Sequence, residues 1–383
     1  MIRQVFEYGP LLAWAGLLLT FVRPLRLGRA GSCALGLFLL LLSQKFLIYK
    51  FFGGDSFVPD LPERFVNVTG WTYSSCMVLF GFACVWWAIC LVRRCVCRTR
   101  KATNVRRDRV VLLACAVVAM MVAGWGIWEG VRVPRVRNVS LAIKGLPREF
   151  DGFRIVQISD LHCSPAARKH RTAEIVACVN ALKPDLVCIT GDSVDGSPEQ
   201  RSDDLSPLKD LKAVHGVLGC SGNHEYYHDY LLWGQIYEAW GIQMLDNAHR
   251  VITRGQGKLV VGGVTDRVAL WNTTRVMAGP DLAKAFAGAP PDGCRILLQH
   301  QPINLALASA ARVRLQLSGH THGGAIWGLD RLVKRMNQGH VRGIYQVGDT
   351  TLYVCPGTGQ WAGFPLRLGV PAEISVLTLH PQP

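Results

Sequence analysis

Four long apolar stretches occupy the first third of this 383-residue chain and limit what it can fold into. They cover about residues 6–22, 31–48, 75–92 and 110–128, and each approaches the ~20 residues that span the apolar core of a bilayer. The last two are clear spans, whereas the first is short unless it begins near Phe6, and the second carries Gln44 and Lys45 near its end. A cleaved signal peptide is the alternative for the first stretch. We therefore expect a multi-pass region of about four transmembrane helices in residues 1–135.

Positive charge is concentrated beside these stretches. Residues 1–135 hold 17 Lys or Arg against 6 Asp or Glu, while residues 136–383 hold 25 against 21. Loops rich in Lys and Arg stay in the cytoplasm, and here these are the first and third loops. We therefore expect a protein of the plasma or inner membrane with residues 136–383 on the exoplasmic or periplasmic side. A basic loop that binds anionic lipid headgroups is the competing explanation of the charge, and nucleic-acid binding is not expected.

From residue 136 onward the pattern changes to short β-branched runs that alternate with segments of helical period. The predicted strands are residues 154–159, 186–190, 217–220, 259–264, 295–299, 314–317, 343–347, 351–354 and 373–379, and the predicted helices are 172–182, 230–240 and 303–311. This alternation is typical of an α/β or α+β layered sandwich, with central β-sheets flanked by helices. Residues 136–383 are numerous enough to form a core of their own.

Acids, amides and histidines follow five of these strands at the point where each strand ends. They stand in the segments 160–162, 191–195, 222–225, 299–302 and 319–322. In open α/β sheets, sites form in the crevice at the carboxyl ends of the strands. Because side chains alternate along an extended segment, Asp160 and His162 are expected to point to one side, and so are His320 and His322.

The residue types at these strand ends are metal ligands. Imidazole, carboxylate and amide oxygen without thiolate suit Zn, Fe or Mn rather than Ca or Mg. Two such ions that share one carboxylate would activate a bridging hydroxide and neutralise a phosphoryl oxygen. The sequence therefore predicts a site for two divalent transition metal ions of unknown identity.

The five motifs D-x-H, G-D-x-x-D, G-N-H-E, H-x-P and G-H-T-H, in this order, resemble those of the calcineurin-like metallophosphoesterase family. The resemblance covers about residues 140–383. The segments 319–324 and 354–358 are similar to the branch of transmembrane proteins with a metallophosphoesterase domain and their bacterial relatives. The resemblance implies a metallophosphoesterase fold in residues 136–383 and a hydrolase that acts on phosphoric esters, phosphodiesters among them, or on anhydrides.

The resemblance also implies a role for each matching residue. One ion would be held by Asp160, His162 and His322, and the other by Asn223, His300 and His320. Asp192 would bridge the two ions. His224 would donate a proton to the leaving oxygen and would be oriented by Asp195. The nucleophile would be the metal-bridging hydroxide, and the substrate a phosphate-containing small molecule or lipid.

Two alternatives to a membrane-anchored hydrolase remain at this point. The chain could be a membrane-tethered scaffold with a structural metal site and no turnover, or its spans could form half of a transporter. Glu225 and Asp266 are expected to be structural acids, and Cys163 is not expected to be a ligand. The sequence leaves the substrate and the oligomeric state open.

One further segment, residues 328–340, has two interpretations. Leu329, Leu332, Val333 and Met336 stand at helical spacing with basic residues between them. This pattern is typical of a surface helix packed on the core. The alternative is an interfacial helix that leans on the bilayer or guides a lipid-linked phosphate.

Overall fold

The computed structural model describes residues 2–96, 105–271 and 278–382, so that part of the basic third loop lies outside the described residues. The chain divides into two compact units. One unit comprises Met1–Glu129 with Ala362–Leu366, and the other comprises Gly130–Trp361 with Arg367–Pro383. A short segment from late in the chain therefore belongs to the helical unit, which the sequence did not suggest.

The helical unit holds three helices that are long and apolar enough to cross a membrane, among the residues that the structure describes. They are residues 4–25, which begin in α1 (Ile2–Leu17), Glu63–Arg93 within α4 (Glu63–Val96), and α5 (Val105–Val131). The second predicted stretch forms α2 (Arg29–Ser43) and α3 (Lys45–Gly53), which meet at an angle of 65°. The number of candidate spans is thus three, or four if the bent pair counts as one.

The bend lies at the two polar residues of that stretch. Gln44 leaves the helical conformation with φ −94° and ψ 41°. The Lys45 side chain is buried, and its Nζ donates a hydrogen bond of 2.7 Å to the carbonyl oxygen of Ala362. A polar group buried among apolar side chains needs such an acceptor, because leaving it without one is costly. The break thus coincides with two polar residues, one of which bonds a segment from late in the chain.

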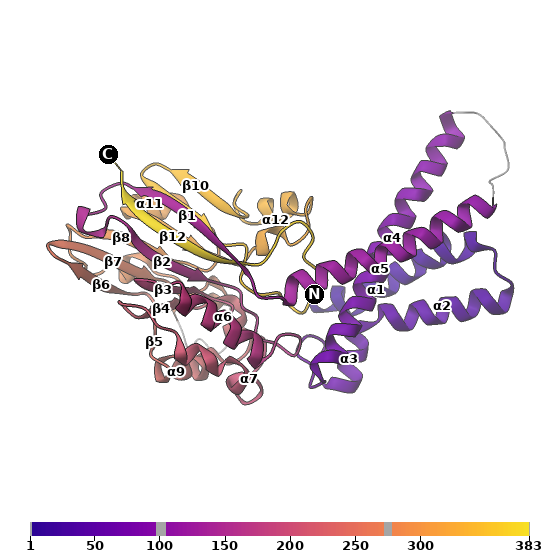
Figure 1. The fold of residues 1–383 in the computed structure, drawn as a ribbon, viewed down its shortest axis with the longest axis horizontal. Helices are drawn as coiled ribbons and strands as arrows, with labels where there is room; N and C mark the ends of the chain where they lie inside the picture. Colours follow the sequence, from indigo (N-terminus) through magenta and orange to yellow (C-terminus); the bar gives the residue numbers. More distant parts are fainter. Residues whose placement is uncertain (1, 97–104, 272–277, 383) are drawn as a thin grey trace. The chain divides into compact units, whose positions relative to one another are not determined.

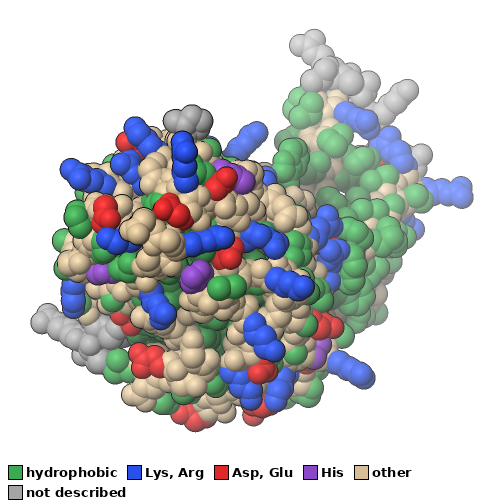
Figure 2. Space-filling view, turned by 60° about the vertical axis from the view of Figure 1, so that its left-hand side comes forward, with side chains coloured by type: hydrophobic (Ala, Val, Ile, Leu, Met, Phe, Trp, Pro, Cys, Tyr) green, Lys and Arg blue, Asp and Glu red, His purple; other side chains and the backbone are tan. Residues whose placement is uncertain are grey.

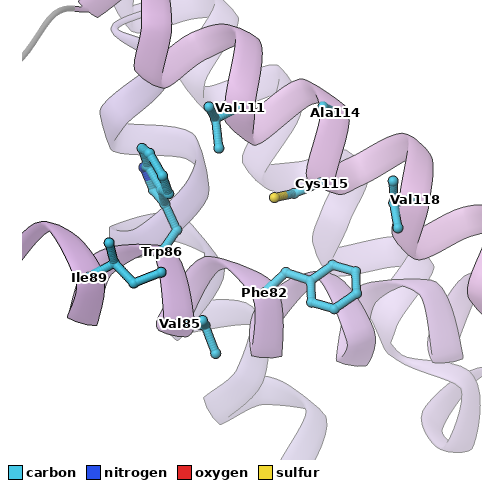
Figure 3. A pocket seen from close by; sticks show the side chains of 8 residues that line it. All are labelled: Phe82, Val85, Trp86, Ile89, Val111, Ala114, Cys115 and Val118. Carbon is cyan, nitrogen blue, oxygen red and sulfur yellow. The ribbon is translucent and has the colours of Figure 1, made fainter.

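The outer surface of the helical unit is apolar. Figure 2 shows hydrophobic side chains over most of the part of this unit that is visible there. Between α4 and α5 lies an apolar groove (Figure 3), lined by Phe82, Val85, Trp86, Ile89, Val111, Ala114, Cys115 and Val118. Helices that are apolar on their outward side suit a lipid environment rather than water.

The other unit is built on two six-stranded sheets (Figure 1). The first has the order β1 (Arg135–Ile143), β12 (Glu373–Pro381), β2 (Phe153–Ile158), β3 (Leu186–Thr190), β4 (Val217–Cys220) and β5 (Ile242–Met244). The second has the order β10 (Gly343–Val347), β11 (Thr350–Val354), β9 (Val313–Ser318), β8 (Cys294–Leu298), β7 (Gly257–Gly263) and β6 (Ala248–Arg254). Strands β2 to β5 run parallel, as do β11, β9, β8 and β7.

The core lies between the sheets and on their outer faces. One buried cluster joins strands of both sheets, among them Ile155 and Leu186 from the first and Ile296 and Leu315 from the second. A second cluster packs α6 (Lys169–Ala181) and α9 (Tyr230–Ala239) on the first sheet. A third packs α10 (Leu282–Ala285) and α11 (Leu305–Ala310) on the second. This is the layered α/β architecture that the sequence predicts.

The predicted strands form close to their expected bounds, but several elements were missed. The prediction missed β1, β5 and β6 as well as α7 (Pro198–Leu205). Strand β1 carries two arginines and an asparagine, and most of its residues are exposed or half-buried. Such a strand lacks the continuous apolar run that identifies a buried strand in a sequence.

Candidate metal centre

Loops that follow strands β2, β3, β4, β8 and β9 meet at one edge of the two sheets. Backbone hydrogen bonds tie these loops together. The Asp160 amide donates to Gly191 O at 2.9 Å, and the Gly319 amide donates to His300 O at 2.8 Å. The predicted site residues are therefore neighbours, although they come from distant parts of the sequence.

The backbone at this edge is strained. Five of the expected ligands, which are not glycines, adopt the left-handed region: Asp160 (φ 52°), His162 (φ 46°), Asp192 (φ 53°), His320 (φ 72°) and His322 (φ 48°). The expectation that extended backbone aligns each D-x-H or H-x-H pair is therefore wrong in its reason, since tight turns bring these side chains together. Backbone conformations of this kind cluster at functional sites and persist where the surrounding structure enforces them.

Asp160, His162 and His322 form one group of potential ligand atoms, all within 4.8 Å of one another. His322 Nε2 lies 3.0 Å from His162 Nε2 and 3.7 Å from Asp160 Oδ1. Asp160 is fully buried, and burial raises the pKa of its carboxyl group. This group is one of the two ligand sets that the family resemblance implies.

Asp192, His300 and His320 form a second such group. His300 Nε2 lies 3.2 Å from Asp192 Oδ2 and 3.2 Å from His320 Nδ1. Asp192 also groups with His162 and His224, so that its carboxylate lies between the two sets. Asn223 begins α8 (Asn223–Tyr227), directly after β4.

Two features indicate that these residues fit cations. His300 Nδ1 lies 2.7 Å from Thr190 O, and because a carbonyl only accepts, this nitrogen carries the proton. Burial lowers the pKa of the His300 ring, but the Asp192 carboxylate outweighs burial and raises this pKa well above its usual range, so Nε2 is protonated and donates a hydrogen bond to Asp192. A cation bound between the two side chains would take the place of that proton. Asn223 Oδ1 is buried without a hydrogen-bond partner, which is costly unless the oxygen binds a metal ion. The donor set therefore suits divalent ions.

Two glycines let the loops approach closely. A Cβ atom on Gly222 would lie 2.2 Å from Asp192 Oδ1. A Cβ atom on Gly319 would lie 1.9 Å from Ser159 Oγ and 2.3 Å from Asp160 Oδ2. Any larger residue at these positions would displace an expected ligand.

His224 differs from the expected ligands in its surroundings. Its Nδ1 lies 2.5 Å from Asp195 Oδ1, and its Nε2 lies 3.9 Å from Asp192 Oδ2. Burial lowers the pKa of the ring, but the Asp192 and Asp195 carboxylates outweigh this effect and raise it to about 9. A side chain so placed is a proton donor at neutral pH.

Asp195 contacts two rings rather than the one expected. Its Oδ1 accepts from His224 Nδ1 and lies 3.1 Å from His162 Nδ1. Burial raises the pKa of this carboxyl group, but His162 and His224 outweigh burial and hold the pKa well below its usual range. One carboxylate thus orients both a potential ligand and the candidate proton donor.

Two further acids support the loops. Glu225 is buried, and its carboxylate accepts hydrogen bonds from the backbone amides of Asp192, Ser193 and Gly222 at 2.7–3.0 Å. Asp266 accepts from the Val268 amide and from Gln301 Nε2. Both geometries match the structural roles expected of these acids.

Sequence reasoning missed one residue at this edge, Arg367. Its guanidinium is fully buried, donates to the carbonyl oxygens of Pro356 and Gly359 at 2.9 and 2.6 Å, and lies 3.1 Å from His322 Nδ1. Nothing in the sequence near residue 367 signals this contact, because the partner lies 45 residues away. The structure also brings His228 within 4.8 Å of ligand atoms of Asp195 and His224.

Comparison with known proteins identifies the domain. Residues 153–324 match the family described as calcineurin-like phosphoesterase. An uncharacterized metallophosphoesterase of Bacillus subtilis is 31% identical over 61% of this chain and 81% of its own length. The chain belongs to the calcineurin-like metallophosphoesterase family. This finding confirms the resemblance seen in the sequence.

Other metallophosphoesterases in this family match more of the chain. The transmembrane protein with metallophosphoesterase domain of Danio rerio is 33% identical over 71% of this chain and 63% of its own length. An uncharacterized metallophosphoesterase of Campylobacter jejuni is 29% identical over 89% of this chain and 87% of its own length. This chain spans about three fifths of the transmembrane relatives of Danio rerio and Bos taurus.

Proposed function

We propose that this metallophosphoesterase is a membrane-anchored enzyme with two divalent metal ions that hydrolyses a phosphate ester or anhydride. The observation that carries the proposal is the pair of ligand groups that meet at Asp192. Asp160, His162 and His322 would hold one ion, Asn223, His300 and His320 the other, and Asp192 both. When bound, Mn, Fe or Zn ions at these positions would supply the hydroxide nucleophile and neutralise phosphoryl charge.

The protein's own residues then position the substrate and move a proton. His224 Nε2 faces the Asp192 side of the site, and its Nδ1 is fixed by Asp195. This arrangement presents a protonated Nε2 to the oxygen that leaves with the alcohol or phosphate product. The substrate would be a phosphate-containing small molecule or lipid.

A scaffold with a structural metal site is the second candidate. A scaffold needs the ligand residues but has no use for a protonated imidazole beside them. His224 lies next to both ligand groups, the Asp192 and Asp195 carboxylates raise the pKa of its ring to about 9, and Asp195 holds it at 2.5 Å. This geometry favours the enzyme.

Removal and replacement of metal tests the proposed activity. Chelation of the purified full-length protein should abolish hydrolysis of a panel of phosphate esters, because the two ions supply the nucleophile. Addition of Mn²⁺, Fe²⁺ or Zn²⁺ should restore it. Hydrolysis that persists after complete chelation would contradict the proposal. So would a metal-loaded protein that hydrolyses no ester or lipid of the panel.

We also propose that the metallophosphoesterase unit lies on the exoplasmic or periplasmic side of the plasma or inner membrane. The support is the excess of Lys and Arg in the first and third loops of the helical region. Labelling of a cysteine introduced at the exposed Gln200 with an impermeant reagent should occur from the outside of intact cells. Labelling only after the membrane is opened would reverse the assignment.

A further inference from the structure

The chain that follows the last metal-site loop carries exposed apolar side chains. After His322–Gly324 it runs through Trp327 into α12 (Asp330–Met336). Trp327 is 77% exposed, Leu332 59% and Met336 72%, and no residue of α12 is buried. The first interpretation of this segment, a helix packed on the core by its apolar stripe, is therefore not what the structure shows.

The apolar side chains of α12 share one face. Leu329, Leu332 and Met336 are separated by three and four residues, which places them on the same side of a helix. A helix that packs on its own domain buries this side, yet all three side chains are exposed. We call Trp327, Leu329, Leu332 and Met336, with the basic residues between them, the α12 patch.

Charge around the α12 patch is positive. Arg331, Lys334 and Arg335 are exposed. Asp330 is the acid of this helix, and its Oδ2 lies 3.7 Å from a guanidinium nitrogen of Arg342. The patch therefore combines exposed apolar side chains, a tryptophan and three exposed basic residues.

The patch is fastened to the metal-site loop. The Trp327 amide donates to Leu368 O at 2.8 Å, one residue after Arg367, which contacts His322. Arg342 donates to Gly323 O at 3.3 Å and pairs with Asp330 at the start of α12. Whatever the patch binds is thus held close to the His322 loop.

We propose that the α12 patch binds the surface of a bilayer that contains anionic lipids. Amphipathic segments with basic and aromatic residues lie at the level of the headgroups, with the apolar side chains inserted and the basic ones paired with lipid phosphates. Tryptophan is enriched at this depth. A second copy of the chain is a weaker fit, because one two-turn helix supplies only part of the ~800 Å² that each partner buries in a stable interface.

This contact would give the metal centre access to phosphate groups at the membrane surface, a consequence that rests on the proposed function. Because the patch belongs to the same chain as the proposed membrane-spanning helices, its contact with lipid would be intramolecular, and a weak contact would suffice. The binding itself does not depend on hydrolysis. The test below therefore measures binding alone.

Photocrosslinking of the full-length protein in vesicles tests the contact. The probe is p-benzoylphenylalanine, introduced as Met336→p-benzoylphenylalanine or, as a control, Val214→p-benzoylphenylalanine, because Val214 is 76% exposed in the same unit. The vesicles contain phosphatidylcholine with about one third phosphatidylglycerol. The probe at position 336 should form lipid adducts at least about tenfold more often than the probe at 214, since only the patch contacts lipid.

Reversal of the charges on the α12 patch distinguishes binding to anionic lipid from crosslinking that occurs only because lipid is nearby. The triple variant Arg331→Glu, Lys334→Glu and Arg335→Glu should lower the adduct yield about tenfold or more, because each basic residue contributes roughly fivefold to binding at an anionic surface. The matched variant Lys183→Glu, Lys209→Glu and Lys212→Glu changes exposed lysines elsewhere in the unit and should keep the yield.

Three results would overturn the proposal: equal lipid adducts at both probe positions, protein–protein adducts at 336 without lipid adducts, or an unchanged yield in the first triple variant. The same adducts should form when His224→Ala is present. The lipid-binding proposal therefore fails on the adduct yield, whereas the proposed enzyme activity fails on hydrolysis, so that the two failures can be told apart.

Discussion

The variant His224→Ala should lose turnover by about 10²–10⁴-fold while it keeps both metal ions. The expected size is that of a general acid, and His224 belongs to neither of the two proposed ligand sets. Steady-state hydrolysis and metal content, measured on the same preparation, check this. The control is His340→Ala, because His340 Nδ1 contacts Pro302 O and its ring lies against Tyr345, so that this variant should keep turnover.

The choice of leaving group sharpens this prediction. An aryl phosphate with an acidic leaving group needs little protonation, so His224→Ala should lose much less activity on it than on an alkyl phosphate. An equal loss on both substrates would show that His224 does not deliver the proton. Loss of metal from this variant would instead show that His224 is a metal ligand.

The pH profile follows from the same pair of residues. The proton donor acts in its protonated form, and the carboxylates Asp192 and Asp195 raise the pKa of His224 to about 9. The rate should therefore fall as the pH rises through the pKa of His224, which the two carboxylates alone set at about 9 and which cations bound at Asp192 would lower. In Asp195→Asn, one of the two carboxylates is gone and the falling limb should move to lower pH. If the rate of Asp195→Asn falls at the same pH as that of the unchanged protein, Asp195 does not set the pKa of His224.

The variant Asp192→Asn should lose metal as well as activity. Asp192 lies between the two ligand groups. Burial raises the pKa of its carboxyl group, but the nearby His300 and His224 rings outweigh burial and hold this pKa well below its usual range, so the group is negatively charged. An amide keeps the shape but removes the negative charge that two cations would share. We expect the metal content to fall to one ion per chain or fewer and hydrolysis to fall by at least about 10³-fold.

A matched variant controls for the loss of a buried acid. Asp246 is an acid of the same unit that accepts a hydrogen bond from Tyr230 outside the metal centre. Asp246→Asn should keep both ions, as measured by mass spectrometry of metal content. Two ions retained in Asp192→Asn would show that this carboxylate does not bridge them.

Much of the fold of the unit with two sheets could be predicted because most of its central strands are buried. Residues 186–189 are apolar and every residue of Leu186–Thr190 is buried, and a run of this kind is visible in the sequence. Strand β1 is polar and mostly exposed, so its position at the edge of the sheet, beside β12, depends on pairing that no local pattern encodes. The strands that the prediction missed, β1, β5 and β6, all lie at sheet edges, whereas the edge strand β10 was predicted.

The residues of the candidate site could be predicted better than their geometry. The residue types after strands β2, β3, β4, β8 and β9 already indicated a metal site. The left-handed turns at Asp160 and His162, the second contact of Asp195 and the contact of Arg367 with His322 depend on packing between distant loops. The hydrogen bond between Lys45 and Ala362, which are 317 residues apart, likewise depends on packing between distant parts of the chain.

Anomalous X-ray scattering from crystals of the metal-loaded protein would locate the bound ions directly. We expect two ions per chain, both in contact with Asp192. One ion should lie at Asp160, His162 and His322, and the other at Asn223, His300 and His320. A single ion per chain, or ions bound elsewhere while these seven side chains hold none, would contradict the proposed two-metal site.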